Sequence, residues 1–312
     1  MKAKLFQEVK VAIVLLCCVL PTMLQAQDMA FGGMEVTKSN CNNLITAFKD
    51  HYTQKGIWGG AFCKASGSVT YDFSTNTLTL NEANITLTVN PSSIDGVVFN
   101  VRLDKLTVNL IGHNVINSGT AAFHQSRNAS SGKDPELIFT GSGTLKINNK
   151  GTRNSRYAGI NLYTDGKMVV NCKELNVFSN WGIAIGAVFQ YNSYGRSTLS
   201  VGNNSALIAK AKGGSIAQIN NFSKGSNCLF HKPQNAYFDY RKKAICDALG
   251  QVITDEVVCA SYNWIPTSVA SVTTNILTQQ NIYSLQGVLI PEKFESLPKG
   301  IYIVNGKKIV KN

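Results

Sequence analysis

The sequence is poor in acidic residues, histidine and proline. Among its 312 residues, 18 are Asp or Glu against 30 Lys or Arg, four are His and seven are Pro. No CxxC pair or histidine-rich spacing occurs after residue 26, which argues against a zinc site. A Ser-His-Asp or Cys-His signature is also missing, and no apolar stretch beyond the first 26 residues is long enough for a membrane helix. We therefore expect no metal, no cofactor and no transmembrane segment.

The first 26 residues have the pattern of a secretory signal peptide. A basic start precedes an apolar run at 11–20, which is too short to cross a bilayer comfortably. Residues 24–26 (LQA) offer a cleavage site that ends in a small residue. A lipoprotein anchor at Cys17 or Cys18 is the weaker alternative, because Leu16 stands where a small residue is wanted. We expect an exported protein, located at the outer cell surface or extracellular.

The chain is strongly basic, with a formal net charge of +12. The leader holds three Lys against Glu8, a net charge of +2, so the remainder carries +10. A basic surface suits an acidic polysaccharide, an acidic cell-surface glycan or nucleic acid. The main basic run, 241–243 (RKK), lacks the interleaved aromatics and the basic stripe of a nucleic-acid site. Nucleic acid is therefore not expected, whereas an acidic glycan stays open beside the simpler interpretation that the scattered charges only keep the protein soluble.

Six cysteines remain after the leader, an even number that permits disulfides in an exported protein. From their positions along the chain, the plausible pairs are Cys41 with Cys63 and Cys246 with Cys259. Cys172 lies within a repeated strand, where it can pack as a small apolar side chain.

One pattern repeats at a constant step of 31 residues. Its copies begin at residues 106 (LTVNL), 137 (LIFTG), 168 (MVVNC) and 199 (LSVGN). Each copy is followed by a second apolar alternation, a glycine-containing break and a third short apolar stretch. A fixed period of this size indicates a solenoid, and the period-2 alternation indicates that the repeated unit consists of strands. Stacked coils bury a continuous core that no single unit could bury alone.

These features predict an all-β fold, a right-handed parallel β-helix of about five coils between residues 77 and 220. The four residues that open the repeats are predicted to stack in one buried column: Leu106, Leu137, Met168 and Leu199. Open ends of such a stack need caps, because their edges would otherwise pair with other chains.

We divide the chain into a signal peptide, an N-terminal cap segment, the β-helix with its C-terminal cap, a linker and a small β-module, at residues 1–26, 27–66, 67–262, 263–276 and 277–312. The N-terminal cap is expected to hold a short helix within 42–51. Pro266 and a Ser/Thr-rich run mark the linker. The C-terminal module reads as three strands joined by turns, a miniature β-sandwich.

Four segments of the body carry a family pattern: 69–72 (VTYD), 77–80 (TLTL), 106–114 (LTVNLIGHN) and 140–145 (TGSGTL). Over about residues 66–220, they resemble right-handed β-helix proteins of the carbohydrate-binding-domain type. The resemblance implies the fold, and some relatives are thought to bind acidic plant polysaccharides with calcium. That property does not carry over here, because this sequence shows no acidic cluster to hold the metal.

The last 40 residues contain 283–287 (YSLQG), 297–302 (LPKGIY) and 307–311 (KKIVK). In combination they resemble the C-terminal sorting domain of the type IX secretion system. The resemblance implies export across two membranes, with removal or surface attachment of the tail. The tail has a short turn at 305–306 where many members carry a longer hairpin, which leaves the secretion route open.

Catalysis on a β-helix needs clustered carboxylates for calcium or paired acids across the scissile bond. Asp104, Asp134 and Asp165 fall at steps of 30 and 31 residues, so they are predicted to stack in a column. Each lies in the turn before a repeated strand, where Asp is favoured, and this structural role is preferred. His113 has no acid partner at the next coil positions and is interpreted as a turn residue, as are His124 and His231.

Two long loops, about one coil apart, combine Arg with Tyr. Aromatic faces stack on sugar rings, and Arg forks hold carboxylates. The candidate ligand-binding residues are Arg153, Arg156, Tyr157, Tyr191, Tyr194 and Arg196. We predict an exported, non-catalytic β-helix that binds a glycan or a cell-surface partner, with acidic polysaccharide favoured. The alternatives are a polysaccharide lyase or glycoside hydrolase of the same fold, and a structural surface spacer or adhesin. The sequence leaves the oligomeric state open.

Overall fold

The chain folds into two units, residues Met1–Tyr262 and Asn263–Asn312. The structure is a computed structural model that describes residues 28–88, 96–100, 103–127, 131–151, 158–187, 196–265, 282–284, 288–290, 296–304 and 307–311. Within these residues no helix is long and apolar enough to cross a bilayer.

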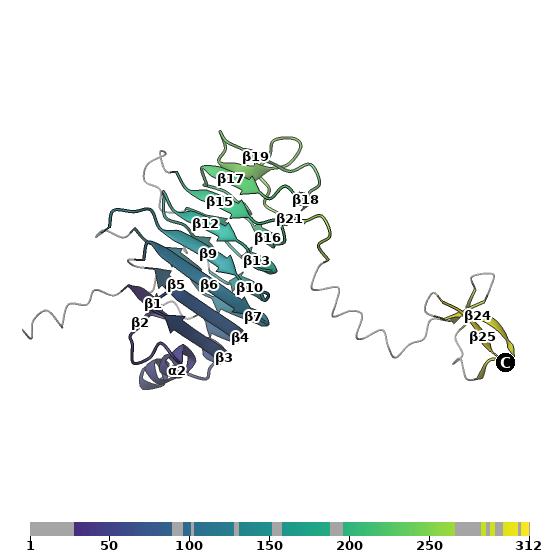
Figure 1. The fold of residues 1–312 in the computed structure, drawn as a ribbon, viewed down its shortest axis with the longest axis horizontal. Helices are drawn as coiled ribbons and strands as arrows, with labels where there is room; N and C mark the ends of the chain where they lie inside the picture. The colour runs from purple at the N-terminus through teal and green to yellow at the C-terminus, as the bar shows by residue number, and fades with distance from the viewer. Residues whose placement is uncertain are drawn as a thin grey trace, which may run out of the picture. The chain divides into compact units, whose positions relative to one another are not determined.

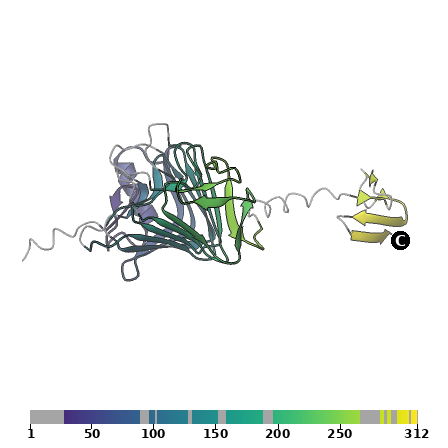
Figure 2. The same cartoon turned by 90° about the horizontal axis from the view of Figure 1, so that it is seen from above.

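The repeats of the first unit form a parallel β-solenoid (Figures 1 and 2). Its coils have three faces, each a set of strands stacked in parallel. The first face consists of β6 (Lys105–Ile111), β9 (Glu136–Thr140), β12 (Lys167–Val170) and β15 (Thr198–Val201). The second face consists of β7 (His113–Ser118), β10 (Thr144–Asn149), β13 (Glu174–Ser179) and β16 (Ala206–Ala211). The third face consists of β5 (Gly96–Asn100), β8 (Ala121–Gln125), β11 (Ile160–Asn161) and β14 (Ile185–Gly186).

The solenoid has about three turns with a period of about 31 residues, fewer than the five coils that the sequence predicts. Three-stranded turns begin at β6, β9 and β12. Before them, β4 (Thr77–Leu87) runs unbroken and pairs with both β6 and β7, so the first repeat has no separate strand for each face. After β16, Ile216 continues the described third face through an isolated bridge to Ile185. The apolar alternation persists at both ends although the complete turn does not.

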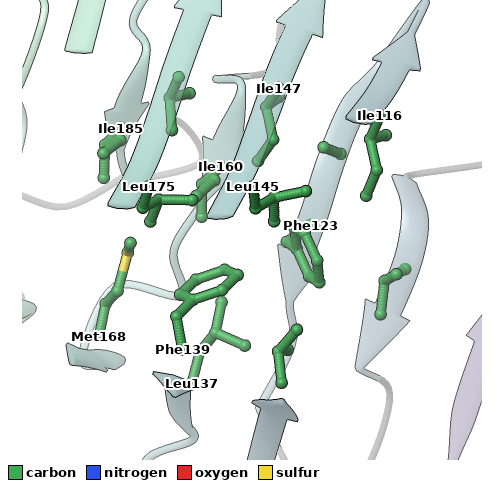
Figure 3. Packing of buried hydrophobic residues seen from close by; sticks show 14 of the residues in the cluster. Ile116, Phe123, Leu137, Phe139, Leu145, Ile147, Ile160, Met168, Leu175 and Ile185 are labelled. Carbon is green, nitrogen blue, oxygen red and sulfur yellow. The ribbon is translucent and has the colours of Figure 1, made fainter. Parts of the chain in front are cut away.

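The predicted inward column is confirmed. Leu106 pairs in register with Leu137, Leu137 with Met168, and Met168 with Leu199, and each of the four is at most 1% exposed. Figure 3 shows how side chains from the three faces fill one interior. There Phe123 of β8 meets Phe139 of β9 edge to face, with ring centroids 5.0 Å apart. Alternation along each strand thus directs every second side chain into the solenoid, as Leu106, Val108 and Leu110 of β6 show.

A helix and an antiparallel hairpin lie at the N-terminal end of the stack. The predicted helix is present as α2 (Leu44–Gln54), where the Asn43 side chain caps the first turn by accepting from the Thr46 amide at 3.0 Å. Its buried face carries Leu44, Phe48 and Tyr52. β3 (Cys63–Asp72) pairs antiparallel with β4, and β1 (Met29–Phe31) pairs with β5 and with β2 (Met34–Glu35).

At the other end, an antiparallel strand and aromatic rings close the stack. β17 (Asn221–Lys224) continues the first face beyond β15. β21 (Val257–Ser261) lies antiparallel between β16 and β18 (Cys228–Lys232), while β19 (Tyr237–Asp239) and β20 (Ala244–Cys246) form a separate hairpin. Phe222 stacks on Phe230 with ring centroids 5.7 Å apart, directly above Leu199 in the inward column.

The second unit contains a four-stranded antiparallel sheet in the order β23-β22-β24-β25. The strands are β22 (Ile282–Tyr283), β23 (Leu289–Ile290), β24 (Gly300–Val304) and β25 (Lys307–Lys311). The described part is thus one sheet with four strands, not the three-stranded miniature sandwich that the sequence suggests. Ile282, Leu297, Tyr302 and Val304 form its own buried cluster.

Candidate functional site

The predicted Arg and Tyr loops lie mostly outside the described residues. This applies to Arg153, Arg156, Tyr157, Tyr191 and Tyr194. Arg196 is described, and it stands two residues before β15, at the edge where coils enter the first face. We call this edge, formed by Asp104, Lys133, Asp134, Asp165 and Arg196, the charged edge.

Arg196 is held by two aspartates of the charged edge. Its guanidinium lies 3.7 Å from a carboxylate oxygen of Asp134 and 3.7 Å from one of Asp165. Its backbone amide also donates to the Asp165 carboxylate at 2.8 Å, across a sequence separation of 31. The side chain is nevertheless 79% exposed. The backbone of Arg196 is therefore anchored to the preceding coil, while its guanidinium remains exposed to solvent.

The third predicted aspartate, Asp104, has its own cation. Lys133 lies 3.4 Å from the Asp104 carboxylate, and the Ser131 hydroxyl donates to the same carboxylate. Glu136 and Lys167 hydrogen-bond through their backbone amides to the Asp104 and Pro135 carbonyls, which keeps these turns in step.

Each of the three aspartates of the charged edge lies within ion-pair distance of a Lys or Arg side chain. Such an arrangement suits recognition of charge. Among the described residues, no group of three or more His, Cys, Asp or Glu side chains is placed to hold a metal ion.

The acid near His113 was missed by the sequence reasoning. Glu82 lies one coil earlier and accepts a hydrogen bond from the His113 backbone amide at 3.3 Å. The ring Nδ1 lies 3.1 Å from the Thr144 hydroxyl. A search one coil upstream would have found Glu82, because the two residues are 31 apart. The cluster forms a polar corner between the first and second faces.

The two other histidines that the sequence analysis interprets as turn residues, His124 and His231, lie in strands instead. His231 contacts the Ser261 carbonyl at 3.0 Å through Nε2, within the β18–β21 pair. His124 occupies β8, in register with Asn161.

The six cysteines among the described residues are buried free thiols, so neither predicted pair is bonded in the structure. Cys246 lies in the β19–β20 hairpin, whereas Cys259 lies between β16 and β18 in the large sheet. Cys41 precedes α2, and Cys63 opens β3. Burial raises the pKa of the Cys63 thiol to about 11 and that of the Cys259 thiol to about 12. Buried thiols with raised pKa values are unreactive structural residues.

Cys172 follows β12 and packs in the core as the sequence predicts, with 1% of its surface exposed. Burial raises its pKa to about 12.

Comparison with family models, curated proteins and solved structures gave no match to this chain.

Proposed function

We propose that this protein is an exported, non-catalytic β-helix that binds acidic polysaccharide. The observation that carries the proposal is the anchoring of Arg196, whose exposed guanidinium is held on a rigid stack of coils. Arg is suited to carboxylates because its planar fork donates two parallel hydrogen bonds. The net charge of +10 that remains after the leader favours the same class of ligand.

Several expectations belong to this proposal. The coils wind in a right-handed sense, as crossovers between parallel strands almost always do. Residues 1–26 act as a signal peptide, and the C-terminal unit serves type IX sorting or surface attachment. The other candidate ligand-binding residues of this proposal are Arg153, Arg156, Tyr157, Tyr191 and Tyr194, which lie outside the described residues. The proposal also includes a location at the outer cell surface or outside the cell.

Enzymatic cleavage is the alternative that the charged edge disfavours. A lyase or hydrolase would need its carboxylates available to metal or substrate. Asp104, Asp134 and Asp165 instead stand within ion-pair distance of Lys133 or Arg196. In a spacer or adhesin without glycan affinity, Arg196 would serve only to stabilise the turn through its contacts with Asp134 and Asp165.

The test is titration with polygalacturonate and with a neutral glucan at low and moderate salt. Binding carried by charge should favour polygalacturonate and weaken as salt screens it over about 8–10 Å. Arg196→Ala and the double variant Arg153→Ala/Arg156→Ala should both weaken it. Equal affinity for both polymers would reject the proposal. Release of reducing ends or unsaturated sugars would establish the lyase or hydrolase instead.

A further inference from the structure

The second face carries two rows of side chains that point away from the solenoid interior, and all of their members except Thr86 and Ile208 are at least partly exposed. One row continues from Asn84 of β4 through Val115, Lys146, Asn176 and Ile208. The next row continues from Thr86 through Asn117, Asn148, Phe178 and Lys210. Successive members of a row lie one strand spacing apart, about 4.8 Å. The face is therefore a regular surface with a fixed spacing of side chains.

Part of this surface is held rigid by an amide ladder. The Asn117 side-chain nitrogen donates to the Thr86 hydroxyl at 3.2 Å, and the Asn148 nitrogen donates to the Asn117 carbonyl oxygen at 3.0 Å. Each bond joins positions 31 residues apart. The ladder fixes the amide orientations without a ligand, which lowers the ordering cost of binding one.

Two exposed aromatic residues, Phe178 and Trp181, lie on the coil that follows the amide ladder. Phe178 follows Asn148 in the row and is 37% exposed. Three residues later, Trp181 occupies the corner between the second and third faces and is 36% exposed. The Lys212 ammonium lies over its indole, 4.9 Å from the ring centroid. Exposed aromatic faces of this kind stack on sugar rings.

Two lysines lie in a third row of side chains, which we call the corner row, at the corner beside Trp181. Asn149, Ser179 and Ala211 are in register, so the residues that follow them, Lys150, Asn180 and Lys212, stand at equivalent places on successive coils. All three are exposed. Lys150 and Lys212 are therefore two strand spacings apart, about 10 Å, on either side of a neutral amide.

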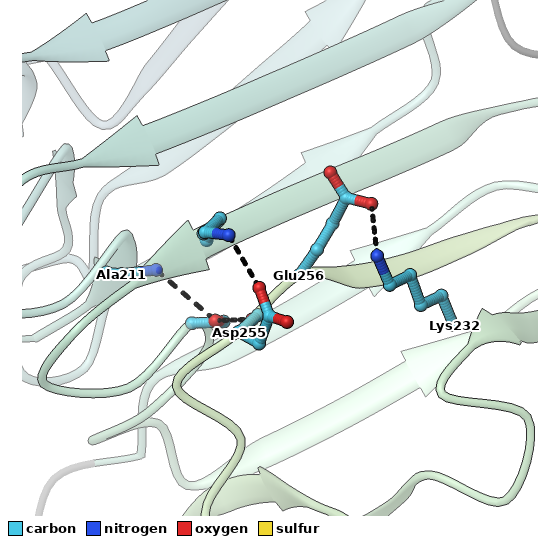
Figure 4. A network of polar contacts seen from close by, with 6 residues as sticks. Ala211, Lys232, Asp255 and Glu256 are labelled. Atoms are coloured by element: carbon cyan, nitrogen blue, oxygen red, sulfur yellow. Dashed lines mark hydrogen bonds and ion pairs between the residues drawn. The ribbon is translucent and has the colours of Figure 1, made fainter.

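The acidic groups described near the second face are already engaged or buried. Asp255 pairs with Lys210 at 2.6 Å, and Glu256 pairs with Lys232 at 3.3 Å (Figure 4). Glu174 is buried at 6% exposure. By contrast, the equivalent row of the first face alternates Lys105, Glu136 and Lys167 in register. The corner row of Lys150, Asn180 and Lys212 therefore lacks the alternation of positive and negative side chains that the first face has.

We propose that Lys146, Lys150, Phe178, Trp181 and Lys212 form a second contact surface for the same acidic polysaccharide. This extension rests on the proposed function. The lysine ammonium groups bind carboxylates, while the indole of Trp181 stacks on a sugar ring between them. The polymer lies across successive coils at the corner, so its charged groups meet cations spaced by the coil repeat.

The experiment compares two double variants that remove equal charge from different faces. Lys150→Ala/Lys212→Ala should weaken polygalacturonate binding by about fivefold or more, as expected for the loss of two exposed ion pairs. Lys105→Ala/Lys167→Ala on the first face should change the affinity by less than about twofold. Thermal melts of both variants establish that the solenoid remains folded.

Tryptophan fluorescence provides an independent readout of the same surface. Polygalacturonate should quench the emission of the wild-type protein, and Trp181→Phe should remove that quenching in a chain that keeps its two other tryptophans. If the wild type binds but both double variants bind equally well or equally poorly, the second surface is wrong and the proposed function stands. If binding leaves the emission of Trp181 unchanged, the surface is also wrong. If the wild type does not bind polygalacturonate, the proposed function itself fails.

Discussion

Two phenylalanine rings that meet inside the solenoid offer a direct test of its closure. Phe123 of β8 and Phe139 of β9 belong to different sheets, are at most 1% exposed, and cross at an interplanar angle of 84°. Replacing either ring by Leu removes buried volume, which should cost about 1–2 kcal/mol, between a volume-conserving swap and truncation to Ala. Removing both should cost less than the sum, because the edge-to-face contact is worth about 0.5–1.5 kcal/mol.

The measurement is a double-mutant cycle by urea unfolding, followed by circular dichroism. Its control pairs Phe139→Leu with Phe48→Leu, because Phe48 packs against Phe31, Tyr52 and Trp58 beside the helix. That control pair should be additive within about 0.5 kcal/mol. A coupling between Phe123 and Phe139 no larger than the control value would mean that the third face does not close onto the first as described.

Three further outcomes follow from close contacts, charge and burial. A Cβ at Gly143 would lie 2.6 Å from a carbonyl oxygen of the coil below, so Gly143→Ala should cost about 1–3 kcal/mol in urea unfolding, whereas Gly60→Ala, with open space around its Cβ, should be neutral or slightly stabilising. The hydrogen bond from Lys210 holds the pKa of Asp255 below its ordinary 3.8; its contribution is present above the unfolded-state pKa and lost as pH falls through the lower folded value, so Asp255→Asn should flatten the loss of thermal stability between about pH 5 and pH 2. The six buried thiols should resist a thiol reagent in the folded protein and should all react after unfolding without reductant, two fewer for each disulfide that forms.

The interior could be predicted from the sequence because it obeys one physical rule. Leu106, Leu137 and Met168 recur every 31 residues in strands that alternate in polarity. Because apolar side chains must be buried, such residues can only stack in one column inside the solenoid. The helix at Leu44–Gln54 could be predicted for the same reason, since its apolar residues share one face. The number of complete coils could not, because apolar alternation continues through β4 although that strand serves two faces at once.

The surface escaped prediction because no comparable rule constrains it. Long loops directed attention to Arg and Tyr residues, whereas Trp181 lies in what reads as an ordinary glycine-containing turn. Its neighbour Lys212 is 31 residues away, but the register there runs 30 residues from Asn149 to Ser179 and 32 from Ser179 to Ala211. A constant step applied to the sequence therefore misaligns this corner by one residue. The stack of Asp134 and Asp165 was predicted, but the bridging by Arg196 depends on side-chain geometry.

In-register stacking gives the corner row a consequence that can be measured. Equivalent side chains one coil apart are close enough for like charges to repel and opposite charges to attract. The first face uses this by placing Glu136 between two lysines, whereas the corner row has Asn180 between Lys150 and Lys212. Asn180→Asp should therefore raise the melting temperature slightly, by the small amount typical of an exposed ion pair, while weakening polygalacturonate binding because it neutralises the same lysines. A variant that is more stable and binds equally well would show that the corner lysines do not contact the polymer.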